Sequence, residues 1–229
     1  MRAGLRRLNR RKARYRNFSE RKRFIAAGLD NKTVFIDGIP GNALGAYLNG
    51  AEITVHGNAQ DAVGDTMNSG RIVVHGNIGD AAGYAMRGGG IYVRGDAGYR
   101  AGIHMKEYEE KRPVMVIGGR CGSFLGEYQA GGLIIVLGLN AGGRDIVGDF
   151  PCTGMHGGRM FLRSRCRGVR FPKNVTVSQA AAADLAEIDE YISEFCALFD
   201  YDKKAVLNAP FTKLVSDSKN PYKQMYVAN

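Results

Sequence analysis

The residue types that could perform covalent chemistry are few, because the chain of 229 residues has only four cysteines and four histidines. Cys121 in GGRCGSFLG, and Cys152 and His156 in FPCTGMH, come nearest to a thiol with a base. A catalytic thiol needs a neighbouring base because the thiolate is the nucleophile. The spacing brings no base to either cysteine, so we predict no catalytic residue on this chain.

Three further residues with polar rings or charges recur at one constant interval, so that they would lie one above another if the intervening segments stacked. His56, His75 and Arg94 follow one another at a constant interval in the sequence. Two imidazoles, one above the other, could bind a metal ion, but a zinc site needs a third and a fourth ligand, and none is evident. We interpret the three residues as a surface ladder and predict no metal site.

Motifs for nucleotide and ester chemistry are absent from the sequence. Ser123 lies in GSFLG, which is not the G-x-S-x-G turn of hydrolases. There is no P-loop, and no G-x-G-x-x-G stands between a strand and a helix, so no cofactor-binding residue is predicted. The cysteines lack C-x-x-C spacing and are expected to be reduced thiols of a cytoplasmic protein; they are Cys121, Cys152, Cys166 and Cys196.

The histidines belong to a repeat that organises the middle of the chain. AEITVHGNAQDAVGDTMNSG is followed by RIVVHGNIGDAAGYAMRGG and then by GIYVRGDAGYRAGIHM, with equally spaced pivot glycines at Gly57, Gly76 and Gly95. An earlier copy pivots on Gly38 at the same interval, and later copies pivot on Gly118 and Gly138 at slightly longer ones. A period of roughly 20 residues is typical of proteins built from stacked coils.

Each copy predicts the same local structure. Residues such as Ile53 and Val55 alternate with more polar ones before the pivot, which indicates a strand. Because every copy has the same order of parts, neighbouring strands should run parallel, and Met67 and Met86 should stack in the interior. We predict an all-β fold, a right-handed parallel β-helix of about six to seven coils of ~20 residues, with a C-terminal α-helix and flanking arms.

Two other features follow from the repeat. Asn58, Asn77 and Asp96 occupy one position just after the pivot, where side-chain amides could bridge one coil to the next. The coil after Gly95 is longer than its neighbours and contains the charged segment KEYEEKR, residues 106–112. Such an insertion emerges as a loop on one face, which is either a binding surface or merely solvated.

At this point the repeat resembles a known family, the GXGXG domain at the C-terminal end of the large subunit of glutamate synthase. VHGNAQDAVGDTMNSGRIVVHGNIGDAAGYAMRGGGIYVRGDAGYRAGIHM carries the resemblance best, and GGRCGSFLGEYQAGGLIIVLGLN and HGGRMFLR extend it over Val34 to Arg163. Related domains occur in N-methylglutamate synthase and in a subunit of formylmethanofuran dehydrogenase. The repeat as a whole is specific, whereas a single glycine triplet is not.

The resemblance implies a structural role. In glutamate synthase an amidotransferase domain releases ammonia from glutamine, and a flavin and iron–sulfur domain adds it to 2-oxoglutarate and reduces the imine. The β-helix domain braces these two and has no known catalytic residue. We therefore expect a non-catalytic scaffold subunit that bridges a glutamine amidotransferase subunit and an FMN/iron–sulfur synthase subunit, with the cofactors on the partner.

Two alternatives remain open. The same scaffold could serve an N-methylglutamate synthase or a formylmethanofuran dehydrogenase type of complex. A β-helix hydrolase or lyase is a different class, but it would need clustered carboxylates or arginines on one face, and the repeat shows no such cluster in register. A hexapeptide acyltransferase would repeat in strict sixes, three to a coil, unlike this chain.

The segment before the repeat, residues 1–30, is a basic arm. Residues 1–23 hold eleven Lys or Arg and one Glu, so they account for the whole formal charge of +10. Leu5, Leu8, Tyr15 and Phe18 are spaced for a helix with a sparse apolar stripe. We expect the arm to cover the open end of the stack or to dock on an acidic partner, rather than to bind nucleic acid or a membrane. No signal peptide or membrane-length apolar run is evident.

The repeat domain is expected to span residues 31–177, followed by two further segments. Residues 178–200 predict an amphipathic helix with Ser178 as its N-cap and an acidic outer face; its apolar stripe consists of Leu185, Ile188, Ile192, Phe195 and Phe199. Residues 201–229 are expected to form an extended tail. Phe211, Tyr222 and Tyr226 would anchor that tail on a neighbour, unless it is disordered.

Overall fold

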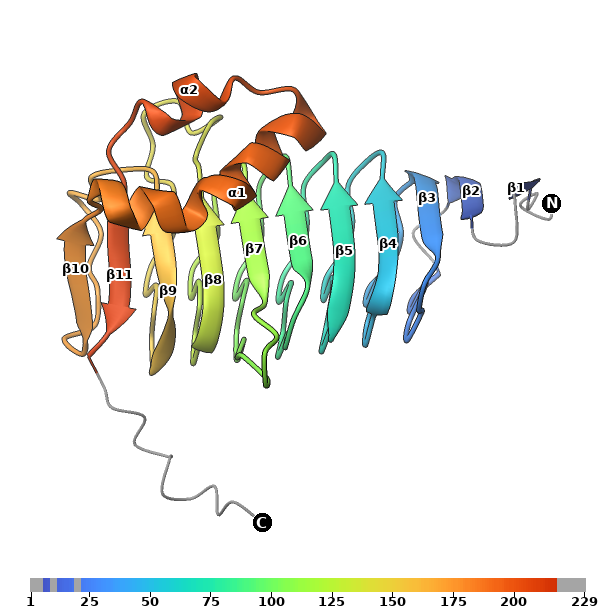
Figure 1. Ribbon diagram of the computed structural model, residues 1–229, viewed down its shortest axis with the longest axis horizontal. Coiled ribbons are helices and arrows are strands. Elements are labelled where there is room, and N and C mark those ends of the chain that lie inside the picture. The colour runs from blue at the N-terminus through green and yellow to red at the C-terminus, as the bar shows by residue number, and fades with distance from the viewer. Residues whose placement is uncertain (1–5, 9–11, 19–21, 218–229) are drawn as a thin grey trace, which may run out of the picture.

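The computed structural model describes residues 6–8, 12–18 and 22–217, which form one large sheet and two helices (Figure 1). The helices are α1 (Ala182–Phe199) and α2 (Lys203–Leu207). The strands are β1 (Arg6–Leu8), β2 (Lys12–Phe18), β3 (Thr33–Gly38), β4 (Asn49–Val55), β5 (Ser69–Val74), β6 (Gly90–Val93), β7 (Val114–Ile117), β8 (Ala130–Val136), β9 (Gly157–Leu162), β10 (Val175–Gln179) and β11 (Thr212–Ser216).

The sheet is mixed, with parallel pairing in its middle and antiparallel pairing at its ends. Strands β2 to β8 each pair in parallel with the next strand in sequence, in the order in which they lie in Figure 1. The register places Ile53 beside Ile72, Ile72 beside Ile91 and Ile91 beside Met115. The prediction of a β-rich fold with parallel neighbouring strands is therefore confirmed.

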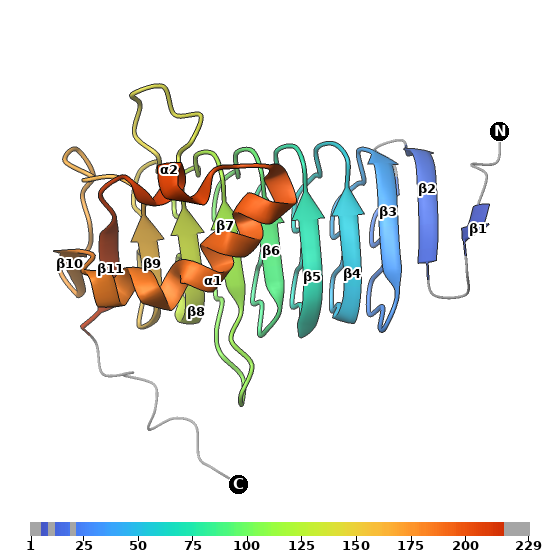
Figure 2. The ribbon, with the colours of Figure 1, turned by 45° about the horizontal axis from the view of Figure 1, so that its top comes forward.

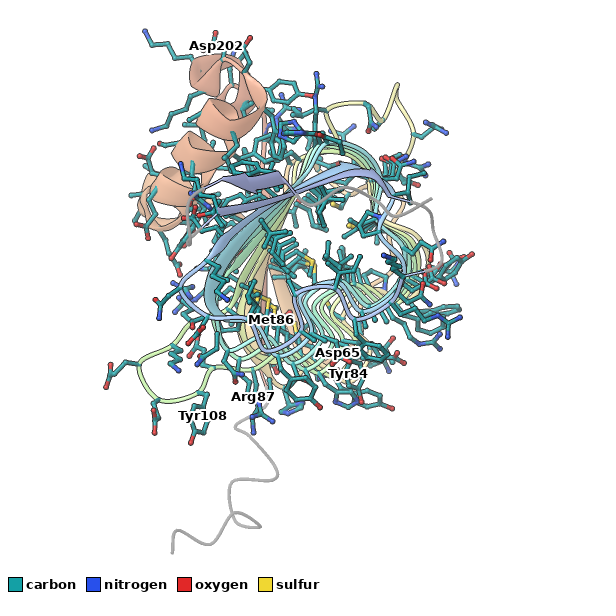
Figure 3. The ribbon with its side chains drawn as sticks, turned by 90° about the vertical axis from the view of Figure 1, so that its right-hand side faces the viewer. Asp65, Tyr84, Met86, Arg87, Tyr108 and Asp202 are labelled. Atoms are coloured by element: carbon teal, nitrogen blue, oxygen red, sulfur yellow. The ribbon has the colours of Figure 1, made fainter. Side chains whose placement is uncertain are left out.

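The connections between strands also stack on one another. Isolated parallel bridges join Ala59 to Ile78, Ile78 to Ala97 and Ala97 to Cys121. The main core lies between the sheet and these connections, and Figure 3 looks along it, with Met86 on the inner side. Met67, Met86 and Met105 are all fully buried there, as their shared position in the repeat predicts.

One predicted pivot was wrong by a single residue. The backbone N–H of Gly119, not of Gly118, donates to the Gly95 carbonyl at 2.9 Å, and Gly138 donates in turn to Gly119 at 3.0 Å. The coil that contains the insertion is therefore one residue longer than predicted, and the next coil returns to the regular interval of the early repeats. Gly118 and Gly119 are adjacent, and only strand pairing distinguishes them.

The pivots are glycine because the coils approach closely there. A Cβ atom on Gly76 would lie 2.7 Å from the Gly57 carbonyl oxygen and 2.2 Å from Oδ1 of Asn58. Gly64 and Gly83, each seven residues after a pivot, are glycines for another reason, because their φ values of +69° and +67° are in the left-handed region that favours glycine. Ala62 and Ala81 adopt left-handed φ of 57° and 54° despite their side chains, at a cost of roughly 1–2 kcal/mol each.

The N-terminal arm covers the first coil, but the helical interpretation was wrong. β2 pairs in parallel with β3, and β1 pairs antiparallel with β2. The free edge of β3 offers backbone donors and acceptors that a helix could not satisfy, and this outweighs a sparse apolar stripe. The expected role of covering the open end agrees with the pairing.

The C-terminal segments also differ from the predictions in detail. Ser178 lies in β10 rather than at a helix N-cap, because α1 begins later, with Ala181 as its N-cap. Residues 203–216 are not an extended tail, since they contain α2 and then β11, which inserts between β9 and β10. Phe211 is buried in the chain's own core, and Tyr222 and Tyr226 lie outside the described residues.

Helix α1 forms a second core on the outer face of the sheet. It runs obliquely across the strands from the β10 end towards β6 (Figures 1 and 2). Its buried residues Ile188, Ile192 and Phe195 pack in one cluster with Val116 of β7 and Phe161 of β9. The apolar stripe of the predicted helix therefore packs against the same chain.

We expect Gly76→Ala to destabilise the protein by about 1–3 kcal/mol, because the added Cβ would overlap backbone atoms of the preceding coil. The matched control is Gly168→Ala, whose Cβ would meet nothing closer than 3.6 Å. The control should change stability by less than about 0.5 kcal/mol. Equal unfolding midpoints in urea for the two variants would contradict the close-approach explanation.

Candidate functional surfaces

The two cysteines considered as nucleophiles from the sequence lie in the interior. Cys121 and Cys152 are buried, and burial raises the pKa of both thiols, that of Cys152 to about 12. The Cys152 sulfur contacts the Met160 sulfur at 3.9 Å, while Nδ1 of His156 lies 3.0 Å from the Gly154 carbonyl oxygen. Burial and the raised pKa disfavour the thiolate, which is the nucleophilic form of cysteine.

The two histidines of the predicted ladder contact each other edge to face. Nδ1 of His56 lies 2.8 Å from a carboxylate oxygen of Asp37, and the His56 and His75 ring centroids are 5.3 Å apart. The His75 ring also contacts Phe199 edge-on at 5.1 Å, at the end of α1. Burial, and then the nearby His56 and Arg94, lower the pKa of His75. Over the described ranges, no three His, Cys, Asp or Glu residues gather as a metal site.

Polar side chains bridge the coils, as the sequence predicts for the Asn column. The Asn77 N–H donates to Oδ1 of Asn58 at 2.9 Å, and the Asp96 N–H donates to Oδ1 of Asn77 at 2.8 Å. A second column behaves in the same way, since the Asp80 N–H donates to Asp61 at 3.0 Å. These side chains satisfy backbone donors that the turns leave without a partner, so their role is structural.

The acidic side of α1 is attached to the sheet by ion pairs that sequence reasoning missed. One carboxylate oxygen of Glu187 accepts hydrogen bonds from Arg112 and Arg159, both at 2.5 Å. Burial alone would raise the pKa of Glu187, but the two arginines outweigh it, so the pKa is lowered. The three residues are far apart in the sequence, and no local pattern indicates the pairing.

A second attachment lies further along α1. Glu194 accepts hydrogen bonds from Arg71 at 2.6 Å and from the Tyr92 hydroxyl at 2.5 Å. Burial and this hydrogen bond raise the pKa of Tyr92 far above its ordinary value. Two carboxylates of the acidic face, Glu187 and Glu194, therefore hold the helix to the sheet.

The inserted segment 106–112 forms a small hairpin with an exposed tip. Tyr108 and Lys111 exchange backbone hydrogen bonds of 3.1 and 3.0 Å, and the hairpin projects beyond the start of β7, past the ends of the neighbouring strands (Figures 2 and 3). Its base is held, because Glu107 accepts a hydrogen bond from the Gly132 N–H at 3.1 Å and Arg112 binds Glu187. Only the tip is available to a partner.

Exposed aromatic rings run along the connections that face away from α1. Tyr84 and His104 contact edge-on at 5.9 Å, and His104 stacks on Tyr128 at 5.1 Å. Tyr84 points outward at the lower edge of Figure 3. The stacking of coils brings together rings that are one coil apart in the sequence. The sequence-based predictions did not include this row of rings, although their spacing follows the repeat.

The fold and these surfaces define a β-rich repeat protein whose polar clusters hold coils and helix together. The chain belongs to the GXGXG motif family, which matches residues 8–219. The recognition of this family from the glycine repeat is thereby confirmed. Within the described residues, no helix is long and apolar enough to cross a membrane.

Two similar proteins extend the comparison. The protein "Uncharacterized protein MJ1350" of Methanocaldococcus jannaschii is 45% identical over 213 residues, covering 90% of this chain and 82% of its own length. A chain in the crystal structure of the formyltransferase/hydrolase complex (FhcABCD) from Methylorubrum extorquens, in complex with methylofuran, has the same fold. It aligns with a TM-score of 0.65 at 20% identity, over 87% of this chain and 71% of that one.

We expect the native cysteines to resist iodoacetamide up to about pH 9, because burial keeps the thiols protonated. Labelling in urea should be complete, and fast labelling of the native chain would contradict the burial.

The raised pKa of Cys152 also predicts how its contribution to the free energy of unfolding changes with pH. This thiol contributes stability below the unfolded pKa near 9, and the contribution is lost as pH rises towards about 12.

We expect Glu187→Gln to lower the free energy of unfolding by roughly 1–2 kcal/mol at pH 7, because Arg112 and Arg159 lose a partly buried ionic partner. Since the pKa of Glu187 is lowered in the fold, its contribution is present above about pH 4.5 and is lost as pH falls through the lowered value. The difference from the parent should therefore shrink as the pH falls below 4.5 and through the lowered pKa of Glu187. Glu109→Gln, at the exposed hairpin tip, is the control and should be neutral.

Proposed function

We propose that this chain is a non-catalytic structural subunit of a multisubunit enzyme of the glutamate synthase type. It would bridge a glutamine amidotransferase subunit and an FMN/iron–sulfur synthase subunit. Ammonia released from glutamine would add to 2-oxoglutarate, and reduction of the imine would yield glutamate. The observation that carries the proposal is the match to the GXGXG family over residues 8–219, nearly the whole chain.

The geometry suits a rigid spacer. Coil-to-coil hydrogen bonds run along both the strands and the connections, and side-chain ladders at Asn58 and Asp61 add to them. A stack whose coils are hydrogen-bonded along both the strands and the connections resists bending. Two partners bound along it would therefore keep a fixed separation. A fixed separation limits the escape of ammonia between the site that releases it and the site that uses it.

The proposal includes a finer description of the fold. We infer that the strands and their connections wind as a right-handed parallel β-helix, since parallel crossovers are right-handed in nearly all proteins. The stacked bridges among Ala59, Ile78, Ala97 and Cys121 support closure of each coil. Such a body exposes several long faces, which is an advantage for a subunit that must contact more than one partner.

The cofactors belong to the partners in this proposal. FMN and the iron–sulfur cluster would be held by the synthase subunit, and the glutaminase nucleophile by the amidotransferase. The buried and protonated thiols of Cys121 and Cys152 support this division, because such thiols neither attack substrates nor readily bind a cluster. We place the assembly in the cytoplasm.

A second candidate keeps the structural role and changes the complex. The shared fold with a chain of the formyltransferase/hydrolase complex favours a one-carbon enzyme, of the formylmethanofuran dehydrogenase type, over an N-methylglutamate synthase. An autonomous β-helix hydrolase or lyase has less support, because the carboxylates Glu187 and Glu194 are engaged by arginines of the same chain.

Native co-purification from the source cell, followed by mass spectrometry, tests the proposal. We expect an amidotransferase with an N-terminal cysteine and an FMN/iron–sulfur protein in stoichiometric amounts, with glutamine-dependent glutamate formation by the complex. Recovery with a molybdenum or tungsten enzyme would replace the proposal with the second candidate. Recovery of the chain alone, with hydrolytic activity on esters or polysaccharides, would overturn both.

A further inference from the structure

The connection between β9 and β10 carries an unusual concentration of positive charge. No acidic residue occurs between Asp149 and Asp184, whereas this stretch contains six Lys or Arg residues. Four of them are exposed on the connection and have no hydrogen bond or ion pair with any described residue; they are Arg165, Arg167, Arg170 and Lys173. Residues 24–229 taken as a whole have equal numbers of acidic and basic residues, so the excess is local.

These cations lie beside two hollows at the end of the stack away from the N-terminus, where the β9–β10 connection is drawn in orange in Figure 2. One hollow is lined by Arg144, Phe150 and Arg170, and the other by Arg165, Lys173 and Val177. Val169 borders both, so the two hollows adjoin. We call Arg144, Phe150, Arg165, Arg167, Arg170 and Lys173 the basic end patch.

An exposed aromatic ring stands in this patch. Phe150 is 62% exposed, stacks on Phe124 at 5.3 Å, and has a left-handed φ of 58°. A bulky residue in that conformation is strained, and its ring gains little burial in return. Exposed aromatic residues surrounded by arginines are the composition that protein–protein interfaces favour.

We propose that the basic end patch is a docking surface for an acidic surface of a partner subunit, with Phe150 as its apolar anchor. The proposal rests on the proposed function, because it assumes that the chain works inside a complex. Four unpaired cations on one connection repel one another, and opposing carboxylates would relieve this repulsion on binding.

The chain's own remaining segments do not fit the patch by charge. Residues 218–229 contain Lys219 and Lys223 and no acidic side chain, and the N-terminal arm is also basic. A nucleic acid fits less well than a protein, because Asp145 and Asp149 line the same hollow as Arg170 and would repel phosphates. An acidic protein surface can place carboxylates against the arginines and avoid the two aspartates.

The test compares two charge-reversed forms of the full chain, each introduced into the source cell in place of the parent. The patch variant is Arg165→Glu, Arg167→Glu and Arg170→Glu, and the control variant is Lys32→Glu, Arg87→Glu and Lys204→Glu, at exposed positions outside the patch. Both change the net charge equally. A third variant, Phe150→Ala, removes the anchor without changing charge.

We expect the patch variant to recover its partner roughly tenfold less than the parent, and Phe150→Ala also to lose most of it, with the control variant unchanged. Partner recovery by the parent should fall as salt is raised. All variants should melt within a few degrees of the parent, which excludes misfolding as the cause. Equal recovery by the patch variant and the parent would overturn the inference and leave the proposed function intact, whereas failure of the parent to recover any partner would overturn the proposed function.

A carbodiimide cross-link identifies the occupant. This reagent joins Lys173 to carboxylates in direct contact, and we expect the linked peptide to come from the acidic surface of a partner subunit. A link from Lys173 to Glu109 or Glu110 of a second copy, with loss of a dimer in the patch variant, would replace the partner with self-association. Binding of a single-stranded DNA oligonucleotide by the parent and not by the patch variant would instead assign the patch to nucleic acid.

Discussion

The close approach of successive coils is the constraint on which the rest of this structure depends. Backbone groups of one coil bond directly to those of the next, as when the Gly95 N–H donates to the Gly76 carbonyl at 3.0 Å. At the pivots the two backbones are so near that a Cβ would overlap the Gly57 or Gly76 carbonyl. Glycine is therefore required at a fixed interval, and the interval determines which residues share a position in neighbouring coils.

Equal spacing makes columns, and the columns carry out different structural tasks. Methionines such as Met67 and Met86 fill the interior, amide and carboxylate side chains such as Asn77 satisfy turn donors, and rings such as His104 and Tyr128 line the outside. Because the spacing is constant, side chains of similar kind meet within a column, as Asn58 and Asn77 do.

The helix and the two ends of the chain complete a body that a repeat alone would leave open. β2 pairs with the first coil, β11 and β10 extend the last one, and α1 covers the outer face of the sheet. Two carboxylates of α1, Glu187 and Glu194, form ion pairs with arginines of the same chain in this packing. Charged residues of the β9–β10 connection, the hairpin tip at Tyr108 and the rings of Tyr84, His104 and Tyr128 remain exposed.

The sequence by itself determined the repeat, the strand direction, the buried columns, the amphipathic helix and the family. All of these depend on short-range patterns: β-branched alternation, a constant interval between glycines and a helical period. It also indicated that Cys121 and Cys152 lack a base, because neither the motif nor the spacing supplies one.

Only the tertiary structure decided which glycine continues the series after the insertion, which strand β11 joins, and where α1 docks. Glu187 meets Arg112 across 75 residues of chain, and Arg71 meets Glu194 across 123. Neither separation follows from the period of the repeat or of the helix. These contacts form only because α1 docks on the sheet. The strand structure of the basic arm has the same origin, because the free edge of β3 exists only once the coils have stacked.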